Sequence, residues 1–211
     1  SMTYSSAYFE KENDNLFDAQ LNKYQKIAES LNLNENSKVL EIGCGWGGFS
    51  TYAAKNFKSK IDAITISKAQ FEYASNKIQK EGLGEKVSIK FKDYRDIDLQ
   101  YSNIASIEMF EAVGKKYWEK YFDVVKNSLV NSGKAVLQII TIDEKRSFNY
   151  QSQPDFIQQY IFPGGMLPTK KELLEINQKV GLDFSEVKSF GPSYAKTLNM
   201  WNNEFQNSWQ D

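Results

Sequence analysis

Residues 39–48 read VLEIGCGWGG, and the prediction of the fold starts from them. Its apolar start predicts a short strand, and the pattern after the glycines predicts a helix to about Phe57. Between the two, Gly43, Gly45 and Gly48 match the spacing G-x-G-x-x-G. Glycines there allow backbone N–H groups to approach a ligand at the start of a helix. The stretch therefore predicts a ligand-binding turn between a strand and a helix.

Outward from this turn, strands and helices alternate along the chain. Strands are predicted at 38–42, 60–66, 86–92, 103–109, 134–142 and 182–190, with a turn at 131–133. Helices are predicted over 16–31, from Ser67 onward, over 116–130, from Thr169 to Gly181, and over 194–209. Strands separated by helices predict an α/β, Rossmann-like fold, with a mostly parallel sheet and helices on both faces. Such a sheet binds ligands at the carboxyl ends of its strands.

The length of 211 residues and the lack of a low-complexity linker favour a single domain over residues 1–211. Residues 1–35 are expected to form an N-terminal helical cover. Residues 143–168 interrupt the alternation, are rich in aromatic residues and end in PGGMLP. Because they follow a strand at the ligand edge, we expect this insertion on the substrate side, as ordinary core or as a lid or tunnel.

Composition excludes several classes of chemistry. The net charge of −1 gives no electrostatic case for binding nucleic acid. With one cysteine and no histidine, an internal disulfide, a Ser/His/Asp triad and a histidine-based metal site are excluded. An acid–base step must then use a carboxylate with a raised pKa, a tyrosine, the thiol or a bound anion. A single thiol and the lack of a membrane-spanning apolar run favour a cytoplasmic location.

Two features of the glycine turn distinguish S-adenosylmethionine from a nicotinamide dinucleotide. Glu41 lies two residues before Gly43, where a carboxylate would repel a pyrophosphate but suits a ligand that carries an ammonium group. The strand over 60–66 has no acid at its tip to bind a ribose, because Asp62 lies too early. The residues therefore favour the methyl donor, with a dinucleotide or a turn without a ligand as the alternatives.

Eight blocks of sequence stand out along the chain. They are YSSAYF (4–9), VLEIGCGWGGF (39–49), TISKAQ (65–70), KDYRDI (92–97), SIEMFEAVG (106–114), LQIIT (137–141), YIFPGGMLP (160–168) and YAKTLNMW (194–201). In these blocks the chain resembles the cyclopropane-fatty-acyl-phospholipid synthases and the related mycolic acid methyltransferases, from Tyr4 to about Trp209. The resemblance implies a class I methyltransferase fold, S-adenosylmethionine as the cofactor, and cis-unsaturated acyl chains of phospholipids or fatty acids as the substrate.

The resemblance also implies a set of cofactor residues, to which Glu41 is added from the reasoning above. They are Tyr4, Ser5, Gly43 and Gly45 around the methionine part and the sulfonium, Thr65 and Gln70 at the ribose hydroxyls, and Asp93 and Tyr94 beside the adenine. Gln70 also stands at the capping-box position of the helix that Ser67 opens, and the two roles are compatible.

Members of the family hold a bicarbonate ion beside the methyl group that is transferred, and the resemblance assigns it to Ser6, Glu111, Gln138, Ile140 and Tyr194. Two positions depart from the pattern: Ser6 stands where the synthases carry cysteine, and Gln138 where they carry histidine. Glu111 is expected to share a proton with the anion or to act as the base itself. The departures suggest weaker anion binding and a methyl-branched product in place of a cyclopropane.

Two other classes of function remain open. A small-molecule N-methyltransferase would methylate an amine, and a non-catalytic protein would bind S-adenosylmethionine without transfer. Basic pairs at 115–116, 145–146 and 170–171 predict either contact with phospholipid head groups at the inner membrane face or a solvated surface. Family chains continue beyond this end with a helical segment and a last strand, so we expect a truncated C-terminus.

Overall fold

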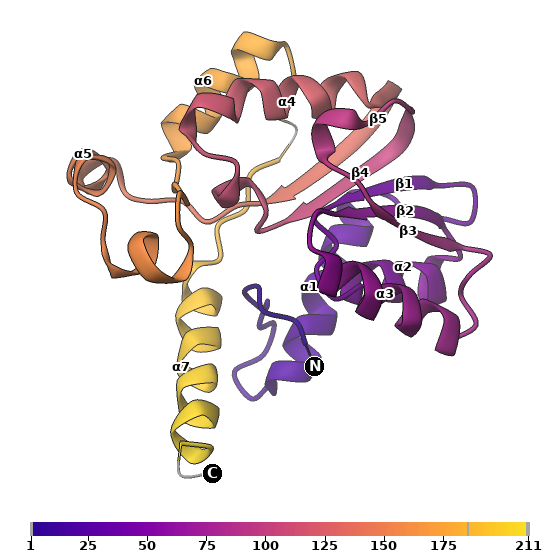
Figure 1. The fold of residues 1–211 in the computed structure, drawn as a ribbon, viewed down its shortest axis with the longest axis horizontal. Helices are drawn as coiled ribbons and strands as arrows, with labels where there is room; N and C mark the ends of the chain where they lie inside the picture. The colour runs from indigo at the N-terminus through magenta and orange to yellow at the C-terminus, as the bar shows by residue number, and fades with distance from the viewer. Residues whose placement is uncertain (1, 185, 210–211) are drawn as a thin grey trace.

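The computed structural model describes residues 2–184 and 186–209, and the strands in this part of the chain form one sheet (Figure 1). They are β1 (Lys38–Ile42), β2 (Lys60–Thr65), β3 (Val87–Phe91), β4 (Tyr101–Ile107) and β5 (Leu129–Gln138). Their order is β3-β2-β1-β4-β5, and every neighbouring pair is parallel. The chain moves outward from β1 to β3 and then returns to the other side of β1. β1 and β4 therefore flank the switch point at which such sheets bind ligands.

Helices cover both faces of the sheet, as the alternation predicted. On one face lie α1 (Leu16–Ser30), α2 (Gly48–Phe57) and α3 (Lys68–Lys80), and on the other α4 (Trp118–Asn127) and α6 (Lys170–Val180) (Figure 1). Asn15, Ser67 and Thr169 open α1, α3 and α6, since each side chain accepts a hydrogen bond from an N–H of the first turn. Short 3-10 turns follow β3 and β4: η1 (Tyr94–Asp96), η2 (Phe110–Ala112) and η3 (Lys115–Tyr117).

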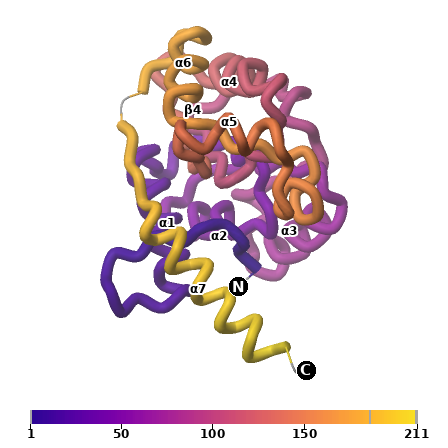
Figure 2. The backbone as a smooth tube through the Cα atoms, turned by 90° about the vertical axis from the view of Figure 1, so that its left-hand side faces the viewer, coloured from indigo at the N-terminus to yellow at the C-terminus, as the bar shows by residue number. Residues whose placement is uncertain are grey.

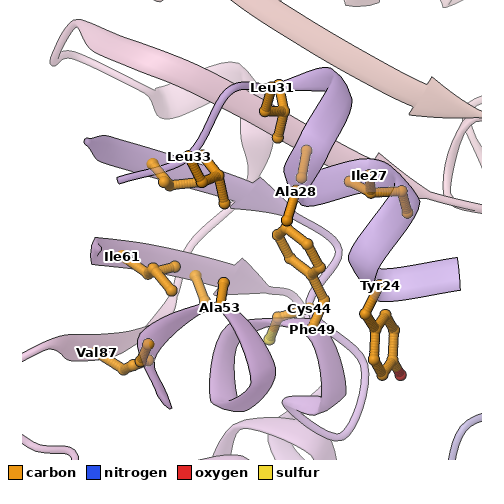
Figure 3. Packing of buried hydrophobic residues seen from close by; sticks show 14 of the residues in the cluster. Tyr24, Ile27, Ala28, Leu31, Leu33, Cys44, Phe49, Ala53, Ile61 and Val87 are labelled. Atoms are coloured by element: carbon orange, nitrogen blue, oxygen red, sulfur yellow. The ribbon is translucent and has the colours of Figure 1, made fainter. Parts of the chain in front are cut away.

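The core consists of two layers of apolar side chains, one on each face of the sheet. Successive side chains of a strand point to opposite faces. Val39 of β1 accordingly belongs to the layer that contains Phe49 of α2 (Figure 3), whereas Leu40 belongs to the layer that contains Phe122 of α4. The same alternation places the side chain of Glu41 on the α2 face.

The prediction for β5 needs correction. The strand begins at Leu129, not at 134, and ends at Gln138, not at 142. Residues 131–133, predicted as a turn, lie inside the strand, where the pairing with β4 shifts in register and Ser132 has a φ of +65°. A bulge accommodates extra residues without ending the strand, and glycine and serine do not distinguish it from a turn.

The strand predicted at 182–190 is wrong, since residues 182–184 and 186–190 carry no strand; Ser185 lies outside the described residues. Phe184 and Val187 of this segment are 44% and 62% exposed, so neither side chain packs into a buried layer. No strand of the described sheet pairs with this segment. An extended segment without a ladder partner is not a strand, whatever its pattern.

The segments 143–168 and 191–207, which follow β5, lie near the carboxyl ends of the strands. Residues 143–168 contain α5 (Glu144–Ser152) and the π-helical turn η4 (Ile157–Ile161), and α7 (Gly191–Asn207) then runs away from the sheet (Figure 1, Figure 2). α7 holds the N-terminal segment, because the N–H of Ala7 donates to Thr197 Oγ1 at 3.0 Å. Within the described residues, none of the helices has the length and apolar character needed to cross a membrane.

Candidate active site

The glycine turn between β1 and α2 is fixed by contacts on two sides. The N–H groups of Gly43 and Cys44 both donate to the carbonyl of Ile64 on β2, at 3.1 and 3.0 Å. Gly43 has a φ of +79°, and a Cβ there would lie 2.7 Å from the side chain of Met109. Glycine is therefore needed where the turn touches the loop after β4.

A cavity of about 250 Å³ lies beside this turn. Five predicted cofactor residues line it: Tyr4, Ser5, Glu41, Gly43 and Gly45. Ile107, the last residue of β4, lines it as well. The cavity therefore reaches the switch point between β1 and β4, where the topology predicted a ligand.

Glu41 brings a buried carboxylate to this cavity. Its exposed fraction is 2%, and the hydroxyl of Ser50 on α2 donates a hydrogen bond to it. Burial raises the pKa of Glu41 to about 8, although the hydrogen bond from Ser50 and the charges of Lys77 and Lys23 act in the opposite direction. A cation in the cavity would stabilise the ionised form.

Thr65 and Gln70 lie at the end of β2 and are tied to the N-terminal segment. The hydroxyl of Thr65 donates to Gln70 Oε1 at 2.9 Å, and Gln70 Nε2 donates to the hydroxyl of Tyr4 at 3.1 Å. Ser67 Oγ also accepts from the N–H of Gln70, as the capping position predicted. The chain of contacts brings the predicted ribose residues next to a residue that lines the cavity.

Asp93 and Tyr94 follow β3 and do not line the cavity. Arg95 pairs with the Asp93 carboxylate at 2.8 Å and lowers the pKa of Asp93. The ring of Tyr94 is buried against Tyr121, with ring centroids 5.2 Å apart. Tyr94 is thus a core residue as well as a predicted neighbour of the adenine.

Glu111 lies in η2, just after β4, and its carboxylate is buried. The N–H of Ile140 donates to Oε1 at 2.5 Å, while Oε2 is buried without a hydrogen-bond partner among the described residues. Burial raises the pKa of Glu111 to about 7, and the charge of Glu108 adds to the rise. The structure thus joins Glu111 and Ile140, and it leaves one carboxylate oxygen of Glu111 without a hydrogen-bond partner among the described residues.

Glu108 is a site residue that the sequence reasoning missed. Its Oε1 accepts hydrogen bonds from the N–H of Ser6 at 2.9 Å and from Gln138 Nε2 at 2.8 Å. Gln138 Nε2 also donates to the carbonyl of Ser6 at 3.3 Å. Burial raises the pKa of Glu108. The signal that could have found it is a second acid, three residues before Glu111, at the end of a buried strand.

Lys23 is a second missed residue. Its side chain is buried under the N-terminal segment, where Nζ donates to Ser5 Oγ at 2.6 Å. Burial lowers the pKa of Lys23 to about 7, against the charges of Glu108 and Glu41. A lysine among the apolar positions of α1 was the available signal.

Tyr194, in the first turn of α7, completes the set. Burial raises the pKa of its hydroxyl, and the charges of Glu108 and Glu111 raise it further. The tyrosine therefore lies within electrostatic range of both acids. The site combines a cavity that favours a cation with two partly buried carboxylates, an arrangement that can stabilise positive charge and accept a proton.

Comparison with known proteins identifies the family. The model of the family described as mycolic acid cyclopropane synthetase matches residues 1–211. The chain belongs to this family.

Two curated relatives illustrate the range of the mycolic acid cyclopropane synthetase family. The chain is 37% identical over 210 residues to cyclopropane-fatty-acyl-phospholipid synthase of Escherichia coli, an alignment that covers 100% of this chain and 52% of that protein. It is 36% identical over 188 residues to tuberculostearic acid methyltransferase of Mycobacterium tuberculosis, covering 89% and 44%. The chain spans about half the length of the curated relatives it matches.

Solved structures of the family share the fold. Mycolic acid cyclopropane synthase complexed with SAH and CTAB superposes with a TM-score of 0.91 at 28% identity, over 97% of this chain and 75% of that chain. For the cyclopropane synthase MmaA2 from Mycobacterium tuberculosis the TM-score is 0.88 at 26% identity, over 97% and 75%. The predicted Rossmann-like class I methyltransferase fold is thereby confirmed, whereas the roles of individual site residues stay predictions.

Proposed function

We propose that the chain transfers a methyl group from S-adenosylmethionine to the cis double bond of an unsaturated acyl chain, such as that of a phospholipid. The observation that carries the proposal is the link between the acids and the wall of the cofactor cavity. Ser5 and Ile107 line the cavity, and the residues that follow them, Ser6 and Glu108, are joined by a hydrogen bond of 2.9 Å. The printed names of the relatives, a fatty-acyl-phospholipid synthase and a tuberculostearic acid methyltransferase, support an acyl chain as the acceptor.

The residues around the glycine turn fit S-adenosylmethionine in charge and in polar groups. Glu41 offers a buried carboxylate to the ammonium group of the methionine part. Tyr4, Ser5, Gly43 and Gly45 would enclose that part, Thr65 and Gln70 would bind the ribose hydroxyls, and Asp93 and Tyr94 would border the adenine. When bound, the cofactor supplies an electrophilic methyl group.

Glu108 and Glu111 supply the rest of the chemistry. A double bond is a weak nucleophile, so the chain must align it and exclude water. Its attack leaves a positive charge on the acyl chain, which the carboxylates of Glu108 and Glu111 stabilise. Loss of a proton from the added methyl group closes a cyclopropane. A hydride shift before proton loss gives a methyl-branched alkene or a methylene product, each of which keeps one double bond.

A bound bicarbonate does not fit these residues. The Ser6 hydroxyl donates to the carbonyl of Ala7, and the Gln138 amide donates to Glu108 and to the Ser6 carbonyl. The N–H of Ile140 donates to Glu111. At Ser6, Gln138 and Ile140 the donors that the resemblance assigned to the anion are thus used within the chain. An added anion would also meet the charges of two acids.

Exposed aromatic side chains after β5 support a lipid acceptor. Phe148, Phe156, Tyr160 and Phe162 are each at least 58% exposed. Of the basic residues nearby, Lys115 forms an ion pair with Glu172 and so is not free to bind head groups. The basic residues at 145–146 are exposed. We expect this face to meet the lipid, and a cytoplasmic location with contact to the inner membrane face stays a prediction.

The test is incubation of the purified chain with methyl-labelled S-adenosylmethionine and vesicles of unsaturated phosphatidylethanolamine. We expect label in the acyl chains and a product heavier by one CH₂ unit, with NMR separating a ring from a branch. Vesicles with saturated chains are the matched control and should take up no label. Methylation of an added amine in preference to the vesicles, or cofactor binding without transfer, would reject the proposal.

Binding of S-adenosylhomocysteine is expected to release a proton from Glu41. The carboxyl is protonated below its pKa of about 8, and the ammonium group of the ligand favours the ionised form. Affinity should therefore rise with pH and stop rising above about pH 8. Calorimetry in two buffers with different ionisation enthalpies measures the proton release.

The Glu41→Gln variant should bind more weakly and release no proton. Glu72→Gln, on the exposed side of α3, is the matched control and should behave as the native chain. Equal proton release by E41Q and the native chain would show that another group is responsible.

A further inference from the structure

The two residues that depart from the family pattern meet at a single atom. The N–H of Ser6 and the amide of Gln138 both donate to Oε1 of Glu108, at 2.9 and 2.8 Å. Ser6 and Glu108 lie 102 positions apart in the chain. The carboxylate of Glu108 therefore takes up the hydrogen bonds of two of the five positions that the resemblance assigned to a bound anion.

The backbone of Glu108 is held in an unfavourable conformation. Its φ is +50°, in the left-handed region that favours glycine, and it is one of few described residues other than glycine there. Such a conformation costs about 1 kcal/mol for a residue with a side chain. Strain of this kind is retained where the surrounding structure needs the side chain, most often at functional sites.

Two opposing effects act on the pKa of Glu108, so its carboxyl can both lose and take up a proton. Lys23 is the positive neighbour, and its charge lowers the pKa of Glu108 while burial raises it. Glu111 and Tyr194 are the other titratable neighbours. Among the described residues, no hydrogen-bond donor contacts the second oxygen of Glu108. That oxygen is therefore available to the acyl chain that accepts the methyl group.

We propose that the carboxylate of Glu108 replaces the bound bicarbonate of the family and is the chain's own proton acceptor in the methylation of lipid. The inference rests on the proposed function. The π electrons of the double bond form the new C–C bond as the C–S bond breaks, and the electron pair of the C–S bond stays on the sulfur. Glu108 then takes a proton, from the added methyl group if the C–H electrons close a ring or from a neighbouring carbon if they form a double bond. The proton passes on to solvent.

The test compares the native chain with Glu108→Gln and Glu108→Gly, in buffer depleted of carbon dioxide and in the same buffer with added bicarbonate. Glutamine keeps an acceptor oxygen for Ser6 and Gln138 but removes the charge. Glycine relieves the backbone strain and leaves both donors open to an anion. Glu119→Gln, an exposed acid on α4, is the control.

We expect native activity to be the same in both buffers. E108Q should lose about 100-fold or more in either buffer while it still binds S-adenosylhomocysteine. E108G should be inactive in depleted buffer and regain activity when bicarbonate is added. Native activity that depends on bicarbonate, or full activity of E108Q, would overturn the inference.

NMR of ¹³C-labelled bicarbonate gives a readout that needs no catalysis. The anion should bind to E108G and not to the native chain. Binding to the native chain would overturn the replacement of the anion even if lipid methylation is observed. Absence of methyl transfer by the native chain would reject the proposed function, and the NMR contrast would still decide whether Glu108 occupies the anion position.

Discussion

Glu111→Gln is expected to lower lipid methylation by about two to three orders of magnitude and to leave binding of S-adenosylhomocysteine unchanged. The substitution keeps an oxygen for the N–H of Ile140, so the contact between η2 and the end of β5 survives. It removes the negative charge from a buried carboxyl whose second oxygen has no partner among the described residues. A positive charge on the acyl chain would then lose an electrostatic partner in a site shielded from water.

The pH dependence of the native chain follows from the same carboxyl. Burial raises the pKa of Glu111 to about 7, so the stabilising anion is present above this pH and is lost below it. The rate of methylation should therefore rise as pH increases through about 7, and this limb should change its position in E111Q, where Glu108 alone remains to titrate. Because Glu108 and Glu111 interact, the limb belongs to the pair of acids.

Rates of methyl transfer to unsaturated vesicles between pH 5.5 and 8.5, roughly centred on the raised carboxyl pKa, give both results. Glu144→Gln, an exposed acid on α5, serves as the control and should keep the native profile. If E111Q retained native activity with an unchanged acid limb, Glu111 would be a structural residue and not a stabiliser of the reaction.

Gly43→Ala should destabilise the protein by about 2–4 kcal/mol and abolish cofactor binding. A Cβ at position 43 would lie 2.7 Å from Met109 Cγ and 2.9 Å from Met109 Cβ, and the φ of +79° adds backbone strain. Met109 follows Glu108, so the clash would also move the acid pair. Thermal unfolding should show a fall in Tm of roughly 5–12 °C for a chain of this size.

The Gly82→Ala variant separates the effect of backbone strain from the effect of the clash with Met109. Gly82 also has a positive φ, of +67°, but nothing lies within 4 Å of a Cβ there. It should lose only about 1 kcal/mol from strain and keep its affinity for S-adenosylhomocysteine. Equal losses in the two variants would show that contact with Met109 contributes nothing.

Local patterns predicted most of the secondary structure because they depend on neighbours in sequence. The apolar residues of β1 and the glycines of its turn act within ten positions, and β1 and α2 lie where they were expected. The prediction of a strand at 182–190 failed, because this segment has no partner strand in the described structure. A strand is defined by its neighbour, which sequence pattern does not reveal.

Only some of the cofactor residues could be predicted from neighbours in the sequence. Gly43 and Glu41 lie in one motif and line one cavity. Tyr94 matched a family block equally well, yet its ring is packed against Tyr121. The side-chain direction of such a residue depends on the helix that folds over it, and α4 is encoded some distance further along the chain.

Composition and short-range spacing were enough to predict the α/β class and the glycine turn and to exclude histidine chemistry, because these properties depend on residue types and on neighbours in the chain. Only the tertiary structure brought Ser6, Glu108 and Gln138 to one carboxylate oxygen, across separations of 102 and 30 positions. Long-range contacts of this kind arise from the order of strands in the sheet and from α7 clamping the N-terminal segment. This packing places Glu108, the residue after β4, in contact with both Ser6 and Gln138.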